Sequence, residues 1–145
     1  MGFVTTLNGV MAESPELLAG YNALAELFGK SSLSKEAKQV VLITASVENN
    51  CGYCVAGHST LALRAGRPLA DARLEAARRL TQTMVTKQGW ADDTEIDAFL
   101  NAGYTRRNVL DVILGVGMKT LSNYTNHVAH TPLDPAWQDQ QWSRT

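Results

Sequence analysis

Apolar residues recur at intervals of three and four along most of the chain, and this spacing marks one face of an α-helix. Residues that cap helices precede these stretches, because their side chains accept hydrogen bonds from the first free backbone N–H groups. No stretch alternates as a half-buried strand would. The pattern predicts an all-α protein of about six or seven helices. The expected start signals are Ser14, Ser34, Asn50, Asp71, Asp92 or Asp93, and Thr105.

The last long helix is apolar almost all round over residues 109–118. A helix of that kind lies either at the centre of a core or in a subunit interface. Gly115 and Gly117 within it are interpreted as points of close helix packing. The polar tail beyond this helix contains Trp137 and Trp142. Two tryptophans there indicate that the tail packs against something, such as a neighbouring subunit.

The two cysteines of the chain lie in one short segment, spaced C-x-x-C and followed by a histidine. Cys51, Cys54 and His58 stand at i, i+3 and i+7, so in a helix they share a stripe within about 60° of arc. A helix is expected from near Cys51 to about Ala65, where residues 66–68 break the pattern. The segment therefore gathers two thiols and a base on one helix face.

Three features of this segment favour a reactive thiolate. The first turn of a helix stabilises negative charge through its free N–H groups and its dipole. His58 can take the proton of Cys54 or stabilise its thiolate. The separation of Cys51 and Cys54 is compatible with a disulfide, so the pair can cycle between dithiol and disulfide.

Three interpretations of the segment remain open from the residues alone. A catalytic dithiol is favoured. A zinc site would use Cys51, Cys54 and His58 with a distant ligand such as His127, but no second pair of ligands supports it. Alternatively, the cysteines are simply two small buried hydrophobic residues. A thioredoxin-type site is disfavoured, because its C-x-x-C needs a βαβ context and no strand is expected.

Composition and charge limit the size of the fold, the class of partner and the cellular compartment that can be expected. The chain has 145 residues, of which 45% are hydrophobic and 19% charged, and this suits one globular domain. The net charge of −1 gives no reason to expect nucleic acid or an anionic membrane as partner. The N-terminus lacks the pattern of a signal peptide, and no apolar run approaches the roughly 20 residues of a membrane span. We expect a cytoplasmic protein, where thiols stay reduced and a C-x-x-C favours catalysis or metal binding.

Residues 34–58, ending in Asn-Asn-Cys-Gly-Tyr-Cys-Val-Ala-Gly-His, resemble the core of the alkylhydroperoxidase D / carboxymuconolactone decarboxylase family. Residues 99–104 and 114–127 are similar to one bacterial subgroup. The resemblance covers most of residues 14–130. It implies an all-α, alkylhydroperoxidase D-like fold, with residues 1–145 as a single domain.

The resemblance also implies a function, thiol-dependent peroxidase activity. In the family's peroxidase branch the second cysteine attacks a hydroperoxide, becomes a sulfenic acid and is resolved by the first cysteine. Carried over, Cys54 is peroxidatic, Cys51 is resolving, and His58 belongs to the proton relay. The implied partners are a hydroperoxide substrate, an external dithiol reductant and further copies of the chain, as a trimer or hexamer. No cofactor and no metal are expected, and residues 131–145 form a C-terminal tail.

Two positions depart from the family pattern. The family often carries a relay glutamate twelve residues before the first cysteine, where this chain has Gln39. Glu48 is the nearest carboxylate in sequence and is the candidate replacement. Tyr53 stands between the cysteines, where the best-known members can have a histidine. His127, which shares a helix face with Asn123, is a further candidate to line the site.

Two other functions stay open beside the peroxidase. A redox-sensing module would use the dithiol to switch its oligomeric state, without turnover. A lactone decarboxylase-like enzyme would need no cysteine. True decarboxylases of the family generally lack the cysteine pair, so its presence favours the peroxidase branch.

Overall fold

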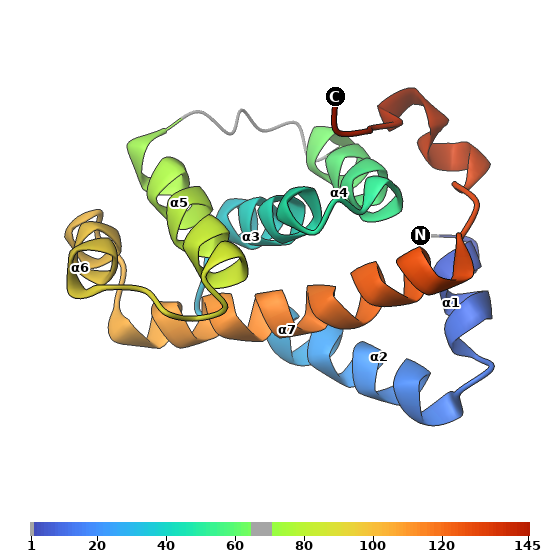
Figure 1. Ribbon diagram of the computed structural model, residues 1–145, viewed down its shortest axis with the longest axis horizontal. Coiled ribbons are helices and arrows are strands. Elements are labelled where there is room, and N and C mark those ends of the chain that lie inside the picture. The colour runs from blue at the N-terminus through green and yellow to red at the C-terminus, as the bar shows by residue number, and fades with distance from the viewer. Residues whose placement is uncertain (1, 65–70) are drawn as a thin grey trace.

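The computed structural model describes residues 2–64 and 71–145, and all regular structure in these two ranges is helical (Figure 1). The all-α class expected from the sequence is confirmed. The break expected at residues 66–68 lies outside the described residues. The helices are α1 (Thr6–Met11), α2 (Pro15–Gly29), α3 (Lys35–Glu48), α4 (Gly52–Arg64), α5 (Ala72–Thr86), α6 (Asp93–Asn101), α7 (Arg106–Ala129) and the short 3-10 helix η1 (Pro135–Gln140).

Side-chain caps begin most of these helices. Five expected start signals each accept a hydrogen bond from the backbone N–H three residues further on, which satisfies a donor that the helix itself leaves free. Helix α1 was not expected from the sequence, because six residues are too few to reveal a helical period. The five confirmed caps are Ser14, Ser34, Asp71, Asp92 and Thr105.

Helix α7 organises the fold. Its 24 residues run along the length of the molecule, with α2 packed beside it and α3 and α5 across its other side (Figure 1). At the crossing with α2 and α3, a Cβ on Gly115 would lie 2.7 Å from the ring of Phe28 and 2.8 Å from Val41. Gly115 is therefore a point of close helix packing, as expected, whereas Gly117 faces open space.

A second buried cluster joins both ends of the chain to α4. It contains Leu7 and Met11 of α1, both cysteines, and Trp137 of η1. Trp137 is 5% exposed and makes an edge-on contact with Tyr53, with ring centroids 5.1 Å apart. The tail thus packs through Trp137 on its own chain, so no neighbouring subunit is needed to bury this residue.

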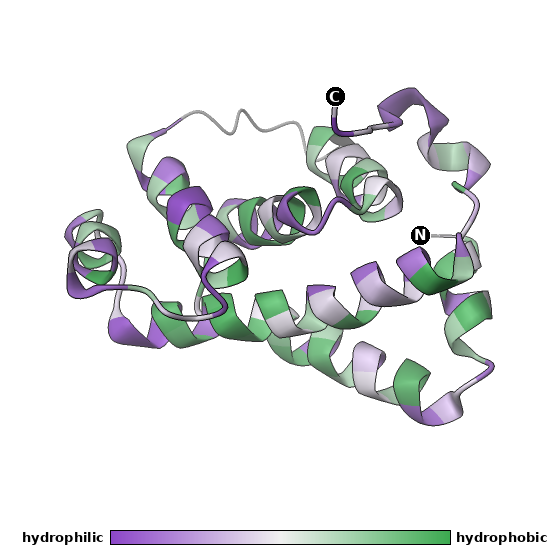
Figure 2. Ribbon diagram, in the orientation of Figure 1, coloured by the Kyte–Doolittle hydropathy of each residue, from purple (hydrophilic) through white to green (hydrophobic). Residues whose placement is uncertain are grey.

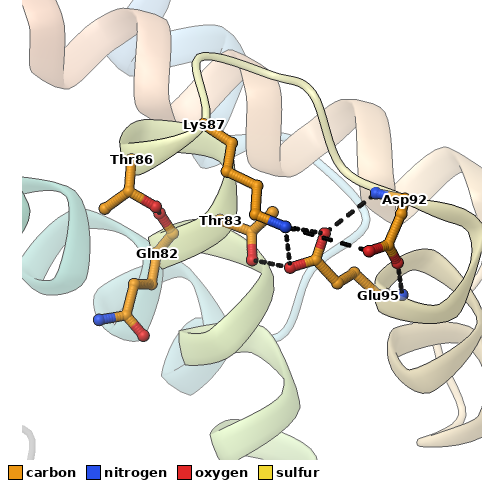
Figure 3. Close-up of polar contacts among 6 residues, drawn as sticks. All are labelled: Gln82, Thr83, Thr86, Lys87, Asp92 and Glu95. Atoms are coloured by element: carbon orange, nitrogen blue, oxygen red, sulfur yellow. Dashed lines mark hydrogen bonds and ion pairs between the residues drawn. The ribbon is translucent and has the colours of Figure 1, made fainter.

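Polar contacts fix α6 against the end of α5 (Figure 3). Lys87 Nζ lies 2.8 Å from Glu95 Oε1 and 4.0 Å from Asp92 Oδ2, and Thr83 donates to Glu95 at 3.2 Å. Glu95 also accepts from the backbone N–H of Asp92 at 3.0 Å, which completes a capping box. These contacts set the direction of α6, at the end of the molecule away from α4 (Figure 1).

The first half of α7 is mostly hydrophobic and much of its second half is polar (Figure 2), and the buried residues of the helix lie on one side. Val112 and Met118 lie in the core, whereas another side of the helix exposes a row of apolar side chains. No described helix is long and apolar enough to cross a membrane. The exposed fractions in this row are 66% for Leu110, 48% for Ile113, 58% for Tyr124 and 84% for Val128.

Candidate active site

A tight turn between α3 and α4 places the first cysteine. Asn49 caps the end of α3, and Asn50 adopts the left-handed conformation with φ 56°. The backbone N–H of Asn50 donates to Val47 at 2.9 Å, and that of Cys51 donates to Ser46 at 2.8 Å. This is the Schellman arrangement of a helix C-terminus. Asn50 therefore ends α3 and does not serve as the expected N-cap, and Cys51 directly precedes α4.

Both sulfurs are buried, and one side chain of α7 reaches both of them. Cys51 is 2% exposed and Cys54 is 3% exposed, and both are free thiols. Asn126 Nδ2 lies 3.2 Å from Cys54 Sγ and 3.6 Å from Cys51 Sγ. Ser122 Oγ lies 3.7 Å from Cys54 Sγ. An amide donor shared by two sulfurs holds them together and stabilises negative charge on either one.

The two thiols differ in acidity. A hydrogen bond from Cys51 lowers the pKa of Cys54 below that of an ordinary thiol, and the positive charge of Lys119 acts in the same direction, while burial opposes both. The same hydrogen bond, together with burial, raises the pKa of Cys51. Cys54 also lies in the first turn of α4, where free N–H groups favour an anion. Cys54 is therefore the more acidic of the two thiols and the one that ionises more readily.

His58 is joined to a lysine of α7. Lys119 Nζ lies 3.0 Å from His58 Nε2, and Lys119 is 1% exposed. Burial, and then the charge of Lys119, lower the pKa of His58 well below its usual value. The imidazole is therefore neutral and accepts a hydrogen bond from the ammonium group. In the described part of the chain, no hydrogen bond joins His58 directly to Cys54.

A cavity of about 180 Å³ opens beside Cys54, between α1, α2, α4, α7 and the tail. Of the two cysteines, Cys54 alone lines it. His58 and Lys119 also line it, and Trp137 and Tyr21 contribute aromatic surface. A small molecule in this space meets the sulfur of Cys54, an amine and an imidazole together.

Glu48, the relay carboxylate suggested by the sequence, makes its polar contacts with Gln82 and Arg144. Gln82 Nε2 donates to Glu48 at 3.0 Å, and Arg144 approaches Glu48 at 3.9 Å. Glu48 thus contacts α5 and the tail. The buried Oε1 of Gln39 has no hydrogen-bond partner in the described part of the chain.

Tyr53 joins α4 to both ends of the chain. Its hydroxyl donates to Asp134 in a short hydrogen bond and accepts from the backbone N–H of Leu7 at 3.1 Å. Thr6 Oγ1 also donates to Asp134, at 2.6 Å. Burial raises the pKa of Tyr53 above that of a free phenol. The side chain is therefore part of a structural junction that closes the cavity.

His127 is exposed and stacks on Tyr124, with ring centroids 6.4 Å apart. Its expected companion Asn123 is fully buried and accepts a hydrogen bond from Asn49 at 3.0 Å. In residues 2–64 and 71–145, no group of three or more His, Cys, Asp or Glu side chains is arranged to hold a metal ion. The described residues thus give the zinc interpretation no support.

Sequence reasoning missed the contribution of α7 to this site. Lys119, Ser122 and Asn126 stand at i, i+3 and i+7, which puts them on one helix face. All three are buried, at 1%, 0% and 6% exposure. Residues 119–127 are mostly polar, so the sequence did not single out these three side chains, and it did not reveal which helix they would meet.

Comparisons with known proteins agree with this fold. Residues 15–84 match the model of the carboxymuconolactone decarboxylase family. No curated protein sequence matches the chain significantly. The structure of an uncharacterized peroxidase-related protein from Silicibacter sp. TM1040 is similar with a TM-score of 0.84 and 18% identity, covering 94% of this chain and 80% of that one.

Two further crystal structures are also similar. One is an alkylhydroperoxidase AhpD core, an uncharacterized peroxidase-related protein from Ralstonia eutropha JMP134, with TM-score 0.83 and 16% identity over 99% of this chain and 84% of that one. The other is the debrominase Bmp8 in complex with 2,3,4-tribromopyrrole, with TM-score 0.82 and 15% identity over 96% of this chain and 82% of that one. At these identities the likeness concerns the fold alone. These structures show that the chain has an AhpD-like fold, and the match to the carboxymuconolactone decarboxylase family model covers residues 15–84 of it.

Proposed function

We propose that this protein is a thiol peroxidase that reduces small hydroperoxides through a dithiol/disulfide cycle of Cys54 and Cys51. The observation that carries the proposal is the position of Cys54. It is the more acidic thiol, it lines a small cavity, and it is hydrogen-bonded to a second thiol that can resolve it. The proposal is supported by the fold, which two peroxidase-related proteins share.

The proposed cycle has three steps. The Cys54 thiolate attacks the peroxide, the O–O bond breaks, and Cys54 becomes a sulfenic acid while the leaving oxygen takes a proton and departs as an alcohol. The Cys51 thiol then displaces the hydroxyl group as water and forms the disulfide. An external dithiol reduces that disulfide by exchange and is itself oxidised. Two free cysteines suit a reducing compartment, and we propose the cytoplasm.

Cys51→Ser tests the proposed resolving step. The variant keeps the Cys54 thiol, so we expect it to react with one equivalent of hydroperoxide and then to stop. The product is a sulfenic acid on Cys54, detected by mass spectrometry after trapping with dimedone. The wild-type protein, assayed in parallel with a dithiol donor, should consume many equivalents. If the wild type also stops after one equivalent, it is a redox sensor and not a peroxidase.

We also propose that the apolar row on α7, which consists of Leu110, Ile113, Tyr124 and Val128, binds a second copy of the chain. The row spans several turns and is continuous with Thr120 and Leu121, which border a surface hollow between α1, α2 and α7. Large exposed apolar surfaces of this kind mark interaction sites. A trimer or hexamer, as in the family that the sequence resembles, would bury it.

Analytical ultracentrifugation tests this assembly. We expect wild-type particles several times heavier than the 15.8 kDa chain. Val128→Asp places a charge in the row and should shift the particles toward the monomer. Trp90→Ser is the matched control, because Trp90 is equally exposed at 84% but lies outside the row. A wild type that sediments as a monomer would exclude the proposed interface.

A further inference from the structure

Lys119 is a buried cation that forms no ion pair with a carboxylate of residues 2–64 or 71–145. It is 1% exposed, and in the described part of the chain its hydrogen-bond partner is His58, with no ion pair to an acidic residue. Burying an ammonium group is costly unless an anion or strong acceptors face it. A lysine at this position therefore needs a functional or structural reason beyond packing.

The charge of Lys119 favours an anion at Cys54, and both residues line the same cavity. The ionisable groups on the described cavity wall are Tyr21 of α2, Tyr53, Cys54 and His58 of α4, and Lys119 itself, and no carboxylate lines the wall. His58 is neutral, and its Nε2 accepts from Lys119. Its other nitrogen, Nδ1, then carries the proton and is buried with no partner in the described residues. Lys119 thus contacts the imidazole and lines the cavity that Cys54 also lines.

The proposed peroxidase reaction needs a proton donor in this space. When the Cys54 thiolate breaks the O–O bond of an alkyl hydroperoxide, the leaving alkoxide is a strong base. Cys51 keeps its proton for the resolving step, Gln39 has no acidic proton, and Glu48 is engaged by Gln82. Lys119 is the cationic acid that lines the same cavity as the sulfur.

We propose that Lys119 is the general acid of this reaction: its ammonium group stabilises the Cys54 thiolate and then gives a proton to the leaving oxygen. This inference rests on the proposed peroxidase function. In the first step, ROOH, the Cys54 thiolate and the Lys119 ammonium become ROH, the Cys54 sulfenic acid and the Lys119 amine. The Cys51 thiol and the sulfenic acid then give the disulfide and water.

The cycle closes with no net change in protons on the protein. A dithiol reductant, R(SH)₂, converts the disulfide to two thiols and becomes a disulfide itself. The Cys54 thiol then transfers its proton to the Lys119 amine, which restores the thiolate and the ammonium. His58 acts as a positioning residue, because its neutral Nε2 accepts from Lys119 and fixes the direction of the amine.

Two peroxides with different leaving groups test the acid role. tert-Butyl hydroperoxide releases a basic alkoxide, whereas peracetic acid releases a carboxylate that leaves without a proton, since carboxylic acids are ionised at neutral pH. The rate of Cys54 oxidation is measured in single turnovers, and the thiolate fraction is measured from the pH dependence of iodoacetamide alkylation. Dividing the rate of Cys54 oxidation by the thiolate fraction gives a corrected rate that reports the effect of the proton donor alone.

Lys119→Met should lower this corrected rate with tert-butyl hydroperoxide by about 10²-fold or more, the usual effect of general acid catalysis. The corrected rate with peracetic acid should change little, and the alkylation midpoint should move to higher pH. Lys119→Arg is the matched control. Its guanidinium keeps the charge, so the alkylation midpoint should stay low, but it gives up a proton poorly, so the alkyl hydroperoxide rate should still fall.

Equal slowing of both peroxides in Lys119→Met, after correction, would overturn the acid role. Lys119→Gln provides a second neutral variant, and circular dichroism checks that each variant is folded. If the wild type oxidises with neither peroxide, the proposed function fails and the acid role with it. If the wild type reacts, and Lys119→Met reacts as fast as the wild type with each of the two peroxides, only the inference about Lys119 fails.

Discussion

Cys54→Ser should abolish hydroperoxide consumption, with a loss on the order of 10³-fold or more, as is usual when the nucleophile of a covalent mechanism is removed. A serine hydroxyl stays protonated at neutral pH, so neither Lys119 nor Asn126 can make it an anion of comparable reactivity. The measurement is the steady-state loss of hydroperoxide in the presence of a dithiol donor.

Cys51→Ser is the internal control for this result. Both substitutions replace a buried sulfur with oxygen at neighbouring positions, so they disturb packing to a similar extent. Cys51→Ser should complete one turnover and Cys54→Ser should complete none. Equal single-turnover reactivity in the two variants would show that the roles of the two sulfurs are assigned wrongly.

Trp137→Ala should destabilise the protein by about 3–5 kcal/mol, the usual cost of removing a buried large aromatic side chain. The ring is 5% exposed, lies on Tyr53 and reaches within 3.1 Å of the position that a Cβ on Gly57 would take. Its loss leaves a void between α4 and the tail and opens the wall of the Cys54 cavity. Urea unfolding measured by circular dichroism gives the change in free energy.

Trp90→Ala is the matched control for stability. Trp90 is 84% exposed, so its removal should change the free energy of unfolding by less than about 0.5 kcal/mol. The comparison also tests the proposal that residues 1–145 form one folding unit. A Trp137→Ala protein as stable as the wild type would mean that the tail does not contribute to the cooperative fold.

Local signals explain why much of the fold was predictable from the sequence. A cap such as Asp71 or Thr105 acts on a backbone N–H only three residues away, so its effect needs no knowledge of the rest of the chain. The turn at Asn49 and Asn50 was also visible: Asn49 is the C-cap of α3, as expected, but Asn50 is not the N-cap of α4. The difference arises because Cys51 donates its N–H back to Ser46, which assigns Asn50 to the end of α3.

The stripe of Cys51, Cys54 and His58 was likewise a local feature, but its chemical surroundings are not local. Lys119 lies 61 positions after His58, and Asn126 lies 72 positions after Cys54. No spacing rule links residues that far apart, because their contact depends on how α7 packs against α4. For the same reason the sequence offered Glu48 as the nearest carboxylate, although its side chain bonds to α5.

The number of free thiols before and after one equivalent of hydroperoxide tests the central claim most directly. The reduced wild-type protein should contain two titratable thiols per chain after denaturation, in keeping with its two free cysteines. After one equivalent of hydroperoxide it should contain none, because both sulfurs enter one disulfide within the same cycle. A protein that still has two thiols, although the hydroperoxide has been supplied, would contradict the account.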